Sequence, residues 1–203
     1  MEPIVALALS YLSGSIPFAA IAGRLRGVDL RKQGSGNLGA TNVFRVLGWK
    51  IGLLVFLDDA LKGALPVLYL PPRIVDTREP IVWAIACGVA AIAGHVRPVF
   101  LKLRRGGKGV ATAAGVFFAL APVPMVVTFA VFVVVVLATG YVSLGSMLSA
   151  IVLPALLLVT LGPRSPLFLV SAVIALFVFW THRANIGRLR RGEEHRFGRG
   201  GGA

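Results

Sequence analysis

The sequence predicts an all-α fold, a polytopic membrane helix bundle of seven transmembrane helices with the N-terminus outside and the C-terminus in the cytoplasm. Of the 203 residues 57% are hydrophobic and 14% are charged, more apolar surface than a soluble domain of this size can bury. The hydrophobic residues form stretches that approach the length of about 20 residues needed to cross a bilayer. The basic residues collect on one side of these stretches.

The expected spans are, in order, about residues 3–23, 51–70, 80–100, 109–123, 125–140, 144–161 and 166–183. We expect the first to be retained, because no basic segment or clear cleavage site precedes it. The fourth and fifth are short, since Ala121-Pro122-Val123-Pro124 must form a tight outer turn between them. Five or six crossings with re-entrant pieces are the alternative. One domain is expected at residues 1–197, with a flexible Gly/Arg tail at 198–203.

The distribution of charge indicates the orientation and the class of substrate. Seventeen of the 21 Lys and Arg residues lie in or beside the connection after the first span, the connection after the third span, and the C-terminal tail. Cytoplasmic loops are rich in Lys and Arg, so this side is predicted to be cytoplasmic. A cationic surface beside lipid suits a phosphorylated, membrane-associated substrate. The net charge of +13 lies between apolar runs too long for a soluble core, so no nucleic acid is expected.

A single cysteine, Cys87, excludes an intramolecular disulfide framework and a zinc cluster, and no metal is expected. Its place within an apolar run indicates a small core residue.

The connection between the first two spans holds a Gly-rich segment with many hydrogen-bond donors. Glycines let the backbone turn its N–H groups toward one point and let an anion approach closely. Hydroxyl, amide and guanidinium groups add side-chain donors. The alternative is an ordinary flexible loop. The candidate anion-binding residues are Gly34, Ser35, Gly36, Asn37, Gly39, Thr41, Asn42 and Arg45.

A second Gly-rich turn, Gly106-Gly107-Lys108-Gly109, runs into the fourth span. It is not a Walker P-loop, because Lys102 and Gly109 stand where that motif needs Gly and Ser or Thr. A glycine turn that opens a helix still presents N–H groups and a lysine to an anion. The alternative is a cytoplasmic anchor whose Lys and Arg side chains face lipid headgroups.

Two segments farther along the chain add polar residues on the same side. The fifth-to-sixth connection contains Ser143, although its small residues suit plain helix packing equally well. After the last span, His182, Asn185 and Arg188 would share one face if the helix continues. A histidine here is also often only a polar tip at the membrane interface.

The second span contains Asp58, Asp59 and Lys62. Charges inside a membrane are costly and normally pair with one another in the protein interior. Lys62 stands four residues after Asp58 and three after Asp59, so an ion pair along one helix is available. We predict a structural pin, because the other spans supply no further acidic groups for an ion pathway.

These segments together resemble the membrane-integral bacterial acyl-phosphate:glycerol-3-phosphate acyltransferase family. The resemblance covers nearly the whole chain. Two departures are Arg97 before Pro98 and Leu103-Arg104-Arg105 before the glycine turn, with one extra residue in that loop. The matching pieces are Ser13-Gly14-Ser15-Ile16-Pro17-Phe18, residues 34–42, Asp59-Ala60-Leu61-Lys62-Gly63, Gly94-His95 with Pro98, residues 106–112, and His182-Arg183-Ala184-Asn185-Ile186 with Arg188-Leu189.

The resemblance implies transfer of a fatty acyl group from acyl phosphate to the 1-hydroxyl of glycerol 3-phosphate, giving lysophosphatidic acid and inorganic phosphate. It implies seven spans and a cytoplasmic active site in the bacterial inner membrane, with no cofactor. The further expected partners are membrane lipids and the soluble enzyme that makes acyl phosphate. The alternatives are a small transporter or flippase for an anionic lipid or phosphate ester, and a structural anchor.

The resemblance also implies roles for the candidate residues. His182 orients or deprotonates the hydroxyl, or the substrate's own phosphate is the base. Ser35 and Asn37 act on the acyl phosphate within the Gly34–Asn42 segment. Asp59, Lys62 and His95 are structural. Arg45, Lys108, Ser143 and Asn185 bind the glycerol phosphate, while Gly106, Gly107 and Arg188 complete the predicted substrate-binding set.

Overall fold

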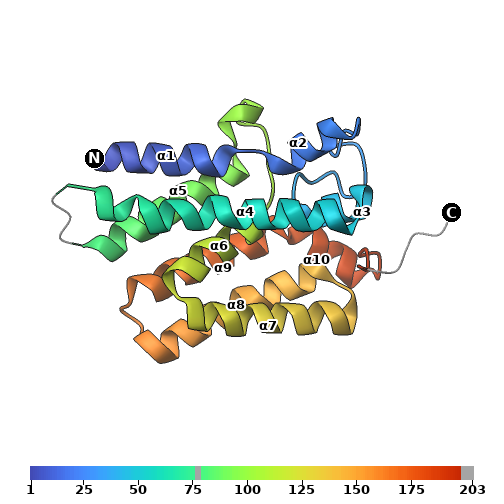
Figure 1. The fold of residues 1–203 in the computed structure, drawn as a ribbon. Coiled ribbons are helices and arrows are strands. Elements are labelled where there is room, and N and C mark those ends of the chain that lie inside the picture. Colours follow the sequence, from blue (N-terminus) through green and yellow to red (C-terminus); the bar gives the residue numbers. More distant parts are fainter. Residues whose placement is uncertain (76–78, 198–203) are drawn as a thin grey trace. The chain divides into compact units, whose positions relative to one another are not determined.

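The computed structural model describes residues 1–75 and 79–197, and in these ranges the chain is helical without strands (Figure 1). The all-α prediction is therefore confirmed for the described residues. The predicted flexible tail at 198–203 lies outside them. Packing divides the chain into two compact units, Met1–Leu120 and Ala121–Ala203.

The first unit contains six α-helices and two short 3-10 helices in its described part. Most of them pack around α4, which contacts every other α-helix of the unit. In chain order the elements are α1 (Pro3–Ser15), α2 (Phe18–Leu25), α3 (Ala40–Leu47), α4 (Trp49–Tyr69), η1 (Pro71–Arg73), α5 (Pro80–Val96), η2 (Val99–Leu101) and α6 (Val110–Leu120).

The second unit is a consecutive series of helices in which α8 packs against α7 and α9. A short polar helix, α10, follows α9 after a bend of 56°. The elements are α7 (Pro122–Thr139), α8 (Val142–Leu161), α9 (Pro166–Thr181) and α10 (Arg183–Arg190).

Proline and glycine explain many of the helix boundaries. Helices α1, α5, α7 and α9 each begin with a proline in the first turn, where the missing N–H has no intrahelical partner to lose. Gly140 ends α7 with φ +76°, and Gly162 ends α8 with φ +82°. Glycine reaches this left-handed conformation without the strain that other residues incur.

The seven predicted spans all coincide with helices, but their lengths and charges differ. Four segments of the described chain are long and apolar enough to cross a membrane, namely Pro3–Leu25, Pro80–Leu101, Pro122–Thr139 and Val142–Leu161. The bent α9–α10 pair is a fifth if it counts as one span. Helix α4 contains four charged residues, of which Asp58, Asp59 and Lys62 lie inside its apolar stretch, and α6 has only 11 residues. Seven crossings and the orientation of the termini stay predictions.

The predicted turn at residues 121–124 was wrong in its extent. Pro122 is the first residue of α7, and Pro124 also lies within the helix, so only Ala121 separates α7 from α6. Both prolines fall in the first turn, where neither removes an intrahelical hydrogen bond. Helix α7 therefore has 18 residues and is not short.

Contacts between distant parts of the chain bring the two basic connections of the first unit together. Helices α1 and α5 pack closely together, and a Cβ at Gly14 would overlap the backbone of Ala91. The Tyr11 hydroxyl donates to the Arg97 carbonyl oxygen at 2.6 Å. Arg31, in the first basic connection, donates to the Arg105 carbonyl oxygen in the second at 3.4 Å. The two basic connections are thus neighbours in the folded unit, as the charge pattern predicted.

The C-terminal segment of the second unit folds back onto the connection between α7 and α8. The backbone N–H of Phe197 donates to the Gly140 carbonyl oxygen at 2.6 Å. The Arg196 guanidinium lies over the Tyr141 ring at 5.2 Å from its centroid and donates to the Tyr141 hydroxyl. The end of the described chain therefore packs beside Ser143.

Candidate functional site

The glycine-rich segment before α3 is held in shape by one buried amide, Asn42. Its Oδ1 accepts a hydrogen bond from the backbone N–H of Ser35 at 2.8 Å. Its Nδ2 donates to the carbonyl oxygens of Leu30 and Gln33, each at 3.0 Å. Gly34 has φ +59°, and a Cβ there would overlap the Asn42 amide. Asn42 was predicted to bind substrate, but both N–H groups of its side-chain amide donate hydrogen bonds to the loop itself.

The other candidates of this segment lie around the start of α3. Gly39 is the N-cap of the helix. Thr41 and Arg45 follow on α3 four residues apart, which places them on one face of the helix. Ser35 and Gly36 are exposed, whereas Asn37, Thr41 and Arg45 are partly buried. The loop thus presents backbone and side-chain donors near the surface of the first unit.

The second glycine-rich turn packs against His95 at the end of α5 and against the first segment. The Gly106 N–H donates to the Val96 carbonyl oxygen at 3.0 Å. A Cβ at Gly107 would overlap the His95 ring and would lie 2.8 Å from the Leu38 carbonyl oxygen. Lys108 follows, partly buried, and Gly109 with φ +82° leads into α6. Residues 34–42 and 106–108 are therefore in contact.

The predicted ion pair within the second span is present. Lys62 Nζ lies 2.7 Å from Asp59 Oδ1, so the pair uses the spacing of three rather than the spacing of four to Asp58. Lys62 Nζ also donates to the Ile16 carbonyl oxygen at 2.8 Å. His95 joins the cluster, with Nδ1 at 3.5 Å from Asp59 Oδ1. All three residues assigned structural roles are thus brought together.

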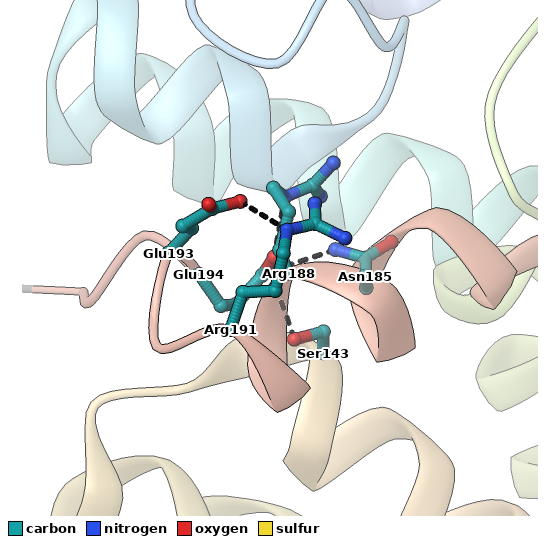
Figure 2. A network of polar contacts seen from close by, with 6 residues as sticks. All are labelled: Ser143, Asn185, Arg188, Arg191, Glu193 and Glu194. Carbon is teal, nitrogen blue, oxygen red and sulfur yellow. Dashed lines mark hydrogen bonds and ion pairs between the residues drawn. The ribbon is translucent and has the colours of Figure 1, made fainter.

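In the second unit, three predicted substrate-binding side chains converge on a carboxylate that sequence reasoning missed (Figure 2). Glu194 Oε1 accepts hydrogen bonds from Ser143 Oγ at 2.9 Å and from Asn185 Nδ2 at 2.7 Å. Glu194 Oε2 accepts from Arg188 Nε at 2.7 Å. The side chains of Ser143, Asn185 and Arg188 therefore form one anion-binding point, and Glu194 occupies it.

The charge state of Glu194 follows from these contacts. Burial on its own raises the pKa of the carboxyl group, but hydrogen bonds from Asn185, Arg188 and Ser143 and the charge of Arg188 outweigh it. The pKa of Glu194 is therefore lowered from the usual value of 4.5. The group is a carboxylate at neutral pH, which suits a site built from donors.

His182 stands at the break between α9 and α10, so the single continuous helix considered for this region was wrong. Its Nδ1 makes a hydrogen bond with the Val178 carbonyl oxygen at 2.8 Å. A carbonyl oxygen only accepts, so Nδ1 carries the proton, and Nε2 of the neutral ring is an acceptor. That tautomer suits a base. Asn185 and Arg188 share a face of α10 instead.

A signal for Glu194 does exist in the sequence. Glu193 and Glu194 are the only acidic residues after Glu79, and they end a run of arginines. A cationic cluster that folds on itself needs a counter-charge, and these two residues are the candidates in the second half of the chain. Composition alone does not say which of the two turns inward.

Comparison with known proteins decides the family. The family model described as glycerol-3-phosphate acyltransferase matches residues 4–192. The chain belongs to this family. The resemblance found in the sequence motifs is thereby confirmed.

Glycerol-3-phosphate acyltransferases from distant bacteria align over nearly their whole length. The Geobacter sulfurreducens protein is 44% identical and aligns over 97% of this chain and 98% of its own. The Aquifex aeolicus protein is 43% identical over 97% and 100%. The match therefore includes both compact units of this family member.

Two solved structures of an integral membrane glycerol 3-phosphate acyltransferase, PlsY, have the same fold. Its glycerol 3-phosphate form aligns with a TM-score of 0.88 and 41% identity, over 97% of this chain and 96% of that one. Its lysophosphatidic acid form aligns with a TM-score of 0.85 and 40% identity, over 97% and 95%.

The Glu194 contacts predict an acid-sensitive second unit in this acyltransferase family member. Because the folded-state pKa is lowered from 4.5, the carboxylate contributes stability above that pH and loses it as the pH falls through the folded-state pKa. Thermal unfolding in detergent between pH 7 and pH 3 is expected to show this loss. The Glu194→Gln variant is expected to show a smaller pH dependence, and parallel curves for the two proteins would contradict the assignment.

Proposed function

We propose that this protein transfers a fatty acyl group from acyl phosphate to the 1-hydroxyl of glycerol 3-phosphate, releasing lysophosphatidic acid and inorganic phosphate. The observation that carries the proposal is the convergence of Ser143, Asn185 and Arg188 on one carboxylate. A family member of which a glycerol 3-phosphate form is solved covers 97% of this chain. A site that binds a carboxylate with three donors has the chemistry to bind a phosphate.

The second unit is proposed to act on the glycerol 3-phosphate. Ser143 and Asn185 hold its phosphate, and Arg188 supports them. Arg45 and Lys108 are proposed to supply further positive charge to the reaction. Glu194 accepts hydrogen bonds from all three side chains and orients them. His182 or a substrate phosphate accepts the proton of the attacking hydroxyl, since the phosphate has a second pKa of about 6 by analogy with phosphoserine.

The first unit is proposed to hold the acyl phosphate. The Gly34–Asn42 segment, shaped by Asn42, presents its N–H groups together with Ser35 and Asn37. Gly106 and Gly107 let the second turn approach the first. Fixed donors of this kind stabilise charge that develops as the phosphate leaves, and they need no reorganisation during the reaction.

The proposed step needs no covalent acyl-enzyme. The hydroxyl oxygen forms a bond to the acyl carbonyl carbon, the bond from that carbon to the phosphate oxygen breaks, and inorganic phosphate carries away the electron pair. The mixed anhydride is already activated, so the protein's task is to bring two anions together, orient them and offset their repulsion.

The same proposal includes the membrane arrangement. We propose seven crossings, with the N-terminus outside and the two units together forming one acyltransferase domain at residues 1–197. The basic connections and the C-terminal tail face the cytoplasm. The enzyme would thus act at the cytoplasmic face of the bacterial inner membrane, where a soluble enzyme supplies acyl phosphate.

Turnover by the purified protein tests the proposed function. The protein in detergent or lipid is given glycerol 3-phosphate with palmitoyl phosphate or with palmitoyl-CoA, and lysophosphatidic acid and phosphate are measured. We expect product only with palmitoyl phosphate. Product with palmitoyl-CoA alone would contradict the donor, and no product with either donor would contradict the function.

A further inference from the structure

The proposed chemistry leaves unused a buried cluster of ionisable groups in the first unit, formed by Asp59, Lys62 and His95. We propose, resting on the proposed function, that His95 is a positioning residue for the reaction. Its imidazole is held by the Asp59–Lys62 ion pair and packs against the Gly106–Gly107 turn. This contact fixes the position of the turn, and thereby the position from which Lys108 reaches the substrate.

The cluster is buried enough to be rigid. The side chains of Asp59, Lys62 and His95 are only 2%, 4% and 5% exposed. Lys62 is fixed from three sides, by Asp59 at 2.7 Å, by the Ile16 carbonyl oxygen at 2.8 Å, and by the Phe18 ring at 5.5 Å from its centroid. A buried charge that lost one of these partners would be strongly destabilised. The position of Asp59 is therefore fixed where His95 meets it.

The two nitrogens of His95 face different neighbours. Nδ1 lies within ion-pair distance of Asp59 Oδ1, at 3.5 Å, and has no other polar partner in the described chain. On the other edge of the ring, Nε2 and Cε1 fill the space that a Cβ on Gly107 would occupy. The ring thus meets Asp59 of α4 at Nδ1 and the glycine turn at Nε2 and Cε1.

The neighbouring glycine meets a different part of the same residue. A Cβ on Gly106 would overlap the main-chain carbonyl oxygen of His95 and lie 2.9 Å from Pro98 Cγ. Gly106 is therefore limited by backbone and by a proline, whereas Gly107 is limited mainly by the imidazole and less by the Leu38 carbonyl oxygen. Substitutions at Gly106 and Gly107 can therefore distinguish an effect of the His95 side chain from an effect of the His95 backbone.

The turn that His95 seats also meets the first glycine-rich segment. Gly107 packs against the Leu38 carbonyl oxygen, and Leu38 is buried. One small cavity of the first unit is lined in part by Leu38, Asp59, Lys62, His95, Gly106 and Gly107. A movement of the ring would therefore shift the turn that carries Lys108 and press on the segment proposed to hold the acyl phosphate.

A double-mutant cycle between positions 95 and 107 tests the proposal. His95→Asn keeps a polar atom near Asp59 but vacates the Nε2 and Cε1 positions. We expect Gly107→Ala to lower kcat/KM for glycerol 3-phosphate about 100-fold in the wild-type background, chiefly through KM, because small misplacements cost about this much. In the His95→Asn background the same change is expected to cost about tenfold or less.

Gly106→Ala is the matched control. Its loss is expected to be the same in both backgrounds, since His95→Asn leaves the backbone oxygen and Pro98 in place. An equal loss for Gly107→Ala with and without the imidazole would overturn the proposal. A coupling seen in thermal unfolding and absent from KM would also overturn it, because His95 would then be merely structural.

Different results would contradict the proposed function and the positioning role of His95. Wild-type protein without acyl-phosphate-dependent turnover would contradict the function, and the cycle would then be measured on binding of glycerol 3-phosphate by calorimetry. If His95→Asn does not fold, His95→Ala replaces it in the same cycle. If neither folds, equal Lys108 side-chain accessibility to an amine-reactive probe in wild type and folded Gly107→Ala would overturn the positioning.

Discussion

Replacing Lys108 by Ala is expected to lower kcat/KM for glycerol 3-phosphate by about three orders of magnitude. In the proposed reaction two phosphate-bearing substrates approach each other, and Lys108 would offset their repulsion where the glycine turn enters α6. The loss of one preorganised charged donor from such a site costs about 4 kcal/mol of transition-state stabilisation. Steady-state kinetics with purified protein and palmitoyl phosphate measures it.

Lys32→Ala is the control for charge alone. Lys32 is an exposed cation of the first basic connection, and its described backbone contact, with Asp29, does not involve the charge. Its replacement removes the same charge and is expected to change kcat/KM less than about threefold, because exposed charges are screened. Equal losses for both variants would mean that overall charge, and not the position of Lys108, matters.

Glu194→Gln is expected to destabilise the second unit and to raise the KM for glycerol 3-phosphate. Glu194 Oε1 accepts from Ser143 and Asn185, and Oε2 accepts from Arg188. A glutamine amide has one oxygen, so in either orientation its NH₂ group meets another donor. Breaking a buried, charge-assisted contact costs about 3 kcal/mol, which corresponds to a fall in Tm of about 6–12 °C.

The neighbouring Glu193→Gln is a close control. Glu193 also accepts a hydrogen bond from an arginine at 2.7 Å, from Arg191, but the two side chains are 54% and 60% exposed. Exposed ion pairs contribute about 0–1 kcal/mol. We expect no change in KM and a change in Tm of about 4 °C or less. If the Glu194→Gln protein has the same KM and Tm as the Glu193→Gln protein, the Glu194 carboxylate does not orient Ser143, Asn185 and Arg188.

Local sequence rules predicted much of the fold. The apolar stretches lie on helices, and prolines mark where four of them begin. The Asp59–Lys62 pair follows from helical spacing and from the cost of charge in a membrane. The proximity of the two basic connections, through Arg31 and Arg105, agrees with the sorting of Lys and Arg.

Other features depend on tertiary contacts that local patterns do not contain. No proline or glycine marks the break at His182, between Thr181 and Arg183. Glu194 reaches Ser143 across 51 positions because the chain folds back. Asn42 is of a residue type that often binds substrates. Its amide hydrogen-bonds to the loop instead, because backbone carbonyl oxygens and N–H groups there need partners.

The proposed function depends most on binding of glycerol 3-phosphate by the side chains assigned to its phosphate. Calorimetric titration of this substrate, without acyl donor, into wild type, Lys108→Ala and Asn185→Ala tests it most directly. The account predicts saturable binding to wild type and at least about tenfold weaker binding to each variant, a loss of 1.4 kcal/mol or more. Wild-type affinity in either variant would contradict it.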